Sequence, residues 1–152
     1  METVSTGKAE FRHWRSLSDG FLVSLIVVGP TFLVEEMWGG KPLIDRSGAV
    51  WVIPAAIMAL GFFAGGRVAG RHRRNAKGAF NQGVLVAALT MPLIFIADLV
   101  RRAVLSQSIT VEVLAIWVGA LAAATLVGGL GGISGRRRVR LARKRNQMDR
   151  FL

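Results

Sequence analysis

The sequence contains no cysteine, which excludes a disulfide framework, a thiolate metal site and a cysteine nucleophile. Histidine is nearly absent too: only His13 and His72 occur, both beside arginines and without a third ligand nearby. No serine–histidine–acid set, phosphate-binding loop or pair of acids within an apolar run is present. The sequence therefore predicts a protein that is not an enzyme and that holds no metal and no cofactor.

Acidic residues are scarce as well, with nine Asp and Glu against 20 Lys and Arg and a formal net charge of +11. Yet 52% of the residues are hydrophobic and the mean hydropathy is +0.45. Long uncharged runs alternate with basic clusters, a segregation that is typical of polytopic membrane proteins. In such proteins a basic excess reflects orientation and attraction to anionic lipid more often than nucleic-acid binding.

Four apolar runs are long enough to cross the roughly 30 Å hydrocarbon layer of a bilayer. The predicted fold class is therefore all-α: a polytopic membrane protein of four transmembrane helices arranged as two hairpins. A cytoplasmic N-terminal segment (1–18) precedes this transmembrane domain (19–134), and a basic cytoplasmic tail (135–152) follows it. The spans are expected at about 19–38, 49–70, 80–100 and 111–134, joined by turns such as 39–48.

The N-terminal segment has two possible structures. Phe11, Trp14 and Leu17 recur at every third position, which fits either a short helix at the headgroup level or an unstructured basic leader. Ser16 and Asp19 stand at capping-box spacing before the first apolar run. We therefore expect the first membrane helix to begin near Ser16.

The distribution of Lys and Arg predicts the orientation. All but four of these 20 residues lie in the N-terminal segment, near the end of the second span or in the tail. Because Lys and Arg in short loops set membrane topology, we expect both termini in the cytoplasm and the protein in the cytoplasmic membrane. The four exceptions are Lys41, Arg46, Arg101 and Arg102.

Glycines at spacings of four in the second and fourth spans allow close approach of helices. We expect them to pack these two spans together within one chain, and a seam between copies is the alternative. The predicted helix-packing residues are Gly61, Gly65, Gly66, Gly70, Gly128 and Gly132. Arginines beside the same two spans are predicted to contact anionic lipid. They are Arg71, Arg73, Arg74, Arg136, Arg137 and Arg138.

No ionisable residue falls near the middle of a predicted span. Asp98 lies near the outer boundary and can pair with Arg101 or Arg102 one turn along the helix. We expect this to be a surface ion pair and not a substrate or proton site. Small four-span multidrug exporters rely on an acidic residue within the first span, and its absence here disfavours that class.

The two hairpins share features that fit either a duplication or coincidence. The first and third spans each contain a proline, and the second and fourth end in Gly65-Gly66 and Gly131-Gly132. The stretch from Gly66 to Arg71, followed by Gly78 and Gly83, resembles an element of small four-span bacterial membrane proteins of uncharacterised function. This resemblance covers the second and third spans, and it implies a bacterial cytoplasmic-membrane protein without specifying an activity.

The predicted function is that of an accessory or interaction component. Its expected partners are membrane lipids, including anionic headgroups, and a homo-oligomer or larger membrane complex, but not nucleic acid. One alternative is a small transporter or channel subunit that works as an oligomer. A second is a membrane-tethered module that binds anionic lipid or nucleic acid, although the tail lacks the interleaved aromatic residues that single-strand binding favours.

Overall fold

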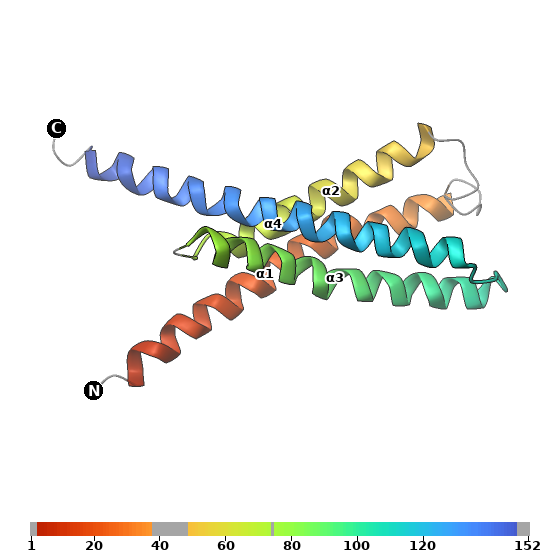
Figure 1. Ribbon diagram of the computed structural model, residues 1–152, viewed down its shortest axis with the longest axis horizontal. Helices are drawn as coiled ribbons and strands as arrows, with labels where there is room; N and C mark the ends of the chain where they lie inside the picture. The colour runs from red at the N-terminus through yellow and green to blue at the C-terminus, as the bar shows by residue number, and fades with distance from the viewer. Residues whose placement is uncertain (1–2, 38–48, 74, 149–152) are drawn as a thin grey trace.

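The computed structural model is an antiparallel bundle of four helices (Figure 1). It describes residues 3–37, 49–73 and 75–148, and the side chains of 14–31, 52–73 and 75–139. The expected turn at 39–48 therefore lies outside the described residues. The first helix begins and the last helix ends at one end of the bundle, which we call the basic end; the connection between the third and fourth helices lies at the other, the loop end. The helices are α1 (Thr3–Met37), α2 (Ala49–Gly70), α3 (Ala76–Val104) and α4 (Val111–Met148).

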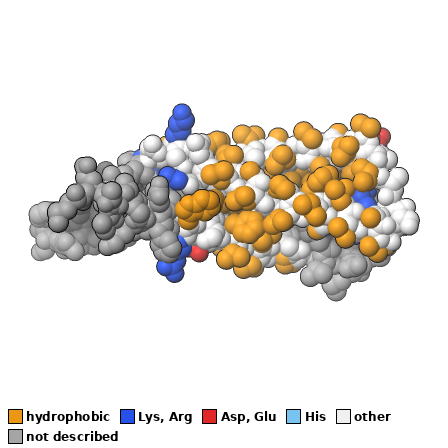
Figure 2. Space-filling view, turned by 90° about the horizontal axis from the view of Figure 1, so that it is seen from below, with side chains coloured by type: hydrophobic (Ala, Val, Ile, Leu, Met, Phe, Trp, Pro, Cys, Tyr) orange, Lys and Arg blue, Asp and Glu red, His pale blue; other side chains and the backbone are white. Residues whose placement is uncertain are grey.

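Within the described residues, three helices are long and apolar enough to cross a membrane: α2 from Val52, all of α3, and α4 as far as Val139. They carry many exposed hydrophobic side chains, including Val118 and Leu126 on α4, and Figure 2 shows a broad belt of such side chains on one face of the bundle. A water-soluble bundle would bury such residues, whereas the hydrocarbon layer solvates them. The chain is therefore a membrane protein by length, composition and surface.

Helix α1 is continuous from Thr3, so the expected helix start at Ser16 is wrong. The Ser16 side chain does not cap its own helix. Its hydroxyl donates to the carbonyl oxygens of Ala69, at 2.8 Å, and Val68, at 3.2 Å, in the last turn of α2. These carbonyls belong to the group that a helix C-terminus leaves without helical partners. Ser16 thus caps α2 from the neighbouring helix.

The other helices also extend beyond the predicted spans. Helix α3 begins at Ala76 and not near Phe80, because the Asn75 side chain accepts the Gly78 backbone N–H at 2.8 Å as an N-cap. Helix α4 does not end near Ser134 but continues to Met148. Most of the basic tail is therefore a helical extension of α4, and Figure 1 shows it projecting beyond the other helices.

Helix α4 packs on both α2 and α3, and the three backbones meet at Gly128. A Cβ atom added at Gly66 on α2, or at Gly83 on α3, would overlap the Gly128 carbonyl oxygen. One turn further along, a Cβ atom at Gly70 would lie 2.6 Å from Gly132 Cα. Only glycine permits these approaches. Gly66 and Gly70 therefore pack α2 against the α4 backbone at Gly128 and Gly132 within one chain, whereas a Cβ atom added at Gly128 or Gly132 would itself meet α3, at the Gly83 or Ala79 carbonyl.

The remaining two predicted packing glycines face α1. A Cβ atom at Gly65 would lie 2.5 Å from the Gly20 carbonyl oxygen, and one at Gly61 would lie 2.6 Å from Val28 Cγ2. One face of α2, with Gly61 and Gly65, thus packs against α1, and another face, with Gly66 and Gly70, packs against α4. This arrangement uses all six predicted packing glycines inside the chain.

The two hairpins cross in the same register. Gly20 contacts Gly65 in the first hairpin, and Gly83 contacts Gly128 in the second. Each residue of the second pair lies 63 positions after the corresponding residue of the first pair (20 to 83, 65 to 128). The next contact follows the same offset: the Ala69 carbonyl meets Ser16, and Gly132 meets the Ala79 carbonyl. Gly65 therefore corresponds to Gly128, and the sequence-based pairing with Gly131 is wrong.

The glycine contacts generate a stability prediction. Gly132→Leu should destabilise the bundle by about 3 kcal/mol or more, because its side chain would have to displace the α3 backbone at Ala79. Gly119→Leu is the matched control in the same helix: nothing lies within 4 Å of its added Cβ atom, so it should be neutral or slightly stabilising. Unfolding in detergent micelles, followed by circular dichroism, measures both.

The same variant separates the two roles of the glycines. If they formed a seam between copies, Gly132→Leu would dissociate an oligomer while leaving the helical bundle of each copy as stable as before. That result, or equal losses of stability for Gly132→Leu and Gly119→Leu, would contradict the packing described above.

Candidate functional site

A carboxylate is buried between α3 and α4 near the loop end. Asp98 on α3 is 5% exposed, and its Oδ2 accepts from Nε of Arg102, one helical turn on, at 2.8 Å. Across the interface, Trp117 Nε1 on α4 donates to the same oxygen at 3.1 Å. The predicted pairing of Asp98 with Arg102 is confirmed, but its placement on the surface is wrong. Arg102 is itself only 8% exposed, since α4 covers this part of α3.

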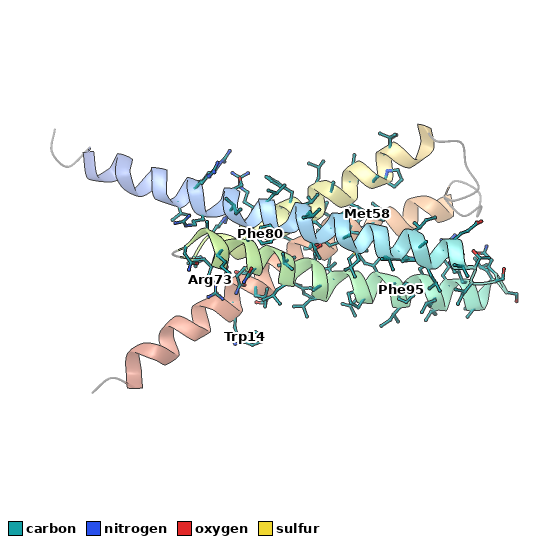
Figure 3. The ribbon with its side chains drawn as sticks, in the orientation of Figure 1. Trp14, Met58, Arg73, Phe80 and Phe95 are labelled. Atoms are coloured by element: carbon teal, nitrogen blue, oxygen red, sulfur yellow. The ribbon has the colours of Figure 1, made fainter. Side chains whose placement is uncertain are left out.

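The indole of Trp117 is held in place on its apolar side. Phe95 meets it edge-to-face, with ring centroids 5.2 Å apart and planes at 67° (Figure 3 labels Phe95). Trp117 also packs against the buried core cluster that contains Met91 and Ile94. An aromatic side chain with one polar atom suits such a boundary position, because its ring joins the core while its N–H finds an acceptor.

The backbone at the end of α3 supports the same cluster. The Gln107 N–H donates to the Arg102 carbonyl at 2.9 Å, and the Ser106 N–H donates to the Ala103 carbonyl at 3.3 Å. Ser106 has a φ of 53°, the left-handed conformation that this type of helix end requires. The turn therefore fixes the last turn of α3, from which Arg102 reaches Asp98.

The Asp–Arg–Trp cluster can hold a charge within an apolar helix pair, but its chemistry is limited. Ionisable groups inside a membrane segment are costly to bury and often mark functional sites. Here the carboxylate oxygen already accepts two hydrogen bonds, one of them from a cation. In the described part of the chain, no three acidic, histidine or cysteine side chains stand close enough to hold a metal ion. The cluster therefore holds α3 and α4 together through the hydrogen bond from Trp117 to Asp98.

A second polar group lies at the basic end. Gln82 on α3 is 5% exposed, and its amide oxygen, in the orientation that satisfies both groups, accepts from the Arg73 guanidinium with Nε 3.3 Å away. Arg73 follows α2, and Figure 3 shows it beside the start of α3. The contact ties the α2–α3 connection to the bundle. Arg73, predicted as a lipid contact, thus also has a partner within the chain.

The other predicted lipid contacts have different surroundings. Arg71, Arg137 and Arg138 are exposed, whereas Arg136 is half-buried. Arg74 lies outside the described residues. Arg71 directly follows α2, and Arg136, Arg137 and Arg138 lie within α4. Arginines therefore stand beside both helices at the basic end.

Sequence reasoning missed two of these polar residues and the partners of a third. Trp117 and Gln82 meet their partners only across a turn, and Ser16 meets α2 only in the packed bundle. Each has a weak signal in the sequence, since a polar side chain or indole near the end of an apolar run needs a hydrogen-bond partner. That signal identifies the need for a partner but not which residue provides it.

Comparison of the chain with protein-family models, with curated proteins and with solved structures finds no match.

The Asp–Arg–Trp cluster yields a stability prediction. Asp98→Ala should destabilise the bundle by about 3–5 kcal/mol, because it leaves the Arg102 guanidinium buried without its partner. Trp117→Phe keeps the ring contact and removes one hydrogen bond, so it should cost only about 1–2 kcal/mol. Unfolding of each variant in the same detergent provides the comparison.

The double variant Asp98→Leu/Arg102→Leu is the control. It removes both charges but leaves the Trp117 N–H without its acceptor, so it should be about 1–2 kcal/mol less stable than the wild type and clearly more stable than Asp98→Ala. A double variant as unstable as Asp98→Ala, or an Asp98→Ala variant as stable as the wild type, would contradict the role of Asp98 as partner of the buried Arg102.

Proposed function

We propose that the chain is an integral protein of the cytoplasmic membrane and that all four helices cross it, with both termini inside. Three helices have the required length and apolarity. Helix α1 packs along α2 and α3, and its uncharged stretch, 20–34, spans roughly 22 Å at 1.5 Å per residue, which would place Asp19 and Glu35 near the edges of the hydrocarbon layer. The basic end holds the termini and most of the Lys and Arg, and the positive-inside rule assigns such an end to the cytoplasm.

Within that membrane we propose that the protein is an accessory or interaction component. The observation that supports this most is the continuity of α4, a single helix from Val111 to Met148. Its last 14 residues extend roughly 20 Å beyond Ser134 at 1.5 Å per residue. This extension carries seven Lys and Arg between positions 136 and 145. A packed membrane bundle thus presents a stiff basic helix, a shape and charge suited to an acidic protein partner.

The packing of the bundle disfavours transport through one chain. Helices α2, α3 and α4 are in backbone contact at Gly66, Gly83 and Gly128, in the interior of the bundle. No passage for a solute can run between backbones that touch. A transport function would therefore need a pathway between several copies.

A small transporter or channel subunit is the second candidate, and one observation favours it. Asp98 is an acid buried in an apolar helix, a position where acids in transporters bind ions or protons. The two candidates make opposite demands. A transporter should move a solute in proteoliposomes and lose that activity in Asp98→Asn, whereas an accessory component should do neither.

The experiment for the accessory role is crosslinking in the native membrane, followed by identification of the crosslinked protein. The triple variant Arg143→Gln/Lys144→Gln/Arg145→Gln should lower the yield of one defined partner at least tenfold, because each basic residue contributes about 1 kcal/mol of attraction to an anionic surface. The matched control Lys41→Gln/Arg46→Gln/Arg101→Gln removes three charges from the opposite side and should leave the yield unchanged.

Two outcomes would contradict the accessory role. One is an equal loss of the crosslinked protein in both triple variants. The other is solute flux by the purified full-length protein that Asp98→Asn abolishes.

A further inference from the structure

The α2 and α4 backbones touch at the basic end, where both helices become basic. A Cβ atom added at Gly135 on α4 would overlap the Arg67 carbonyl oxygen of α2 and lie 2.9 Å from its carbonyl carbon. One turn earlier, Gly132 and Gly70 make a similar contact. The positions of arginines near this crossing are therefore set by backbone contact and not by flexible side chains.

Three arginines gather at this crossing. Arg138 follows Gly131 and Gly135, the two glycines whose added Cβ atoms would overlap α2 carbonyls, by seven and three residues, so it shares their face of α4. Arg67 lies in the last turn of α2, and Arg71 directly follows the end of this helix. Arg71 and Arg138 are exposed and Arg67 is half-buried. Two helices thus bring like charges together on either side of one backbone contact.

Among the described side chains, no carboxylate forms an ion pair with these three arginines. The acids whose side chains are described are Asp19, Asp98 and Glu112, and Asp98 is engaged at the loop end. Like charges held together at the edge of a low-dielectric region repel one another unless an anion lies between them. Guanidinium groups match phosphate oxygens in charge and in hydrogen-bond geometry.

The surface beside the arginines is apolar. Leu60 on α2 precedes Arg67 by seven residues, so it lies two turns deeper on the same face, and it is 65% exposed. On α4, exposed Leu130 lies about two turns before Arg138. Figure 2 shows Lys and Arg side chains where the belt of hydrophobic side chains ends. A charged group bound at the arginines would thus have an apolar surface next to it.

We propose that Arg67, Arg71 and Arg138 form a binding site for the phosphate of an anionic phospholipid headgroup, whose acyl chain lies along Leu60. Basic sites between membrane helices on the cytoplasmic side bind such headgroups. The proposal rests on the membrane placement proposed above, and it is independent of the accessory role. A soluble phosphate has the same charge but gains nothing from the apolar surface, so the site should favour the lipid.

The test is binding of fluorescent phosphatidylglycerol to the full-length protein in neutral detergent micelles. Arg138→Gln should weaken binding about tenfold or more. Arg137→Gln is the matched control: it removes the same charge one residue away, but about 100° around the helix from Arg138, and should weaken binding less than twofold. Neutral phosphatidylcholine should bind at least tenfold more weakly than phosphatidylglycerol. Circular dichroism without added lipid verifies that each variant is folded.

Three outcomes would overturn the site. Equal losses in Arg137→Gln and Arg138→Gln would show attraction by net charge alone. Competition by glycerol phosphate at the same concentration as the lipid would show a free-phosphate site. Equal binding of phosphatidylcholine would show that the headgroup charge is not recognised. None of these outcomes alters the membrane orientation, which thiol labelling measures separately.

Discussion

Backbone contact at glycine is the constraint on which the rest of this bundle depends. Lipid offers little hydrophobic drive for one apolar helix to bind another, so close van der Waals packing must supply it. Gly128 provides this packing to α2 and α3 at once, and Gly65 provides it between α1 and α2. The hydroxyl of Ser16 adds a hydrogen bond across one of these contacts. The order of helices in the bundle follows from where glycine permits approach.

The glycine contacts give the two ends of the bundle different roles. At the loop end, the Asp98–Arg102–Trp117 cluster and the turn after α3 hold one hairpin in register. At the basic end, α2 and α4 stay in contact as far as Gly135, and α4 continues as a helix to Met148. The charged surface of the protein is therefore carried by a helix whose base is fixed in the bundle. This coupling underlies both the accessory role and the headgroup site that we propose.

Much of the fold could be predicted from the sequence, because membrane segments and close-packing glycines leave local signals. Helical structure, the approximate limits of three apolar helices and the glycines between α2 and α4 are examples. What failed depended on contacts between distant residues. Asp98 looked like a surface residue because its cover, Trp117, lies 19 positions away on another helix. Ser16 looked like a helix start because its hydrogen-bond partner lies at the end of α2, far from Ser16 in the sequence.

The orientation of α1 tests the account most directly, because three spans or four leave the N-terminus on opposite sides of the membrane. The absence of cysteine makes single introduced cysteines the only thiols in the protein. With an impermeant thiol reagent on intact cells, we predict that Ser108→Cys is labelled and that Ser5→Cys is labelled only after permeabilisation. Labelling of Ser5→Cys in intact cells would place the N-terminus outside and contradict the four-span bundle.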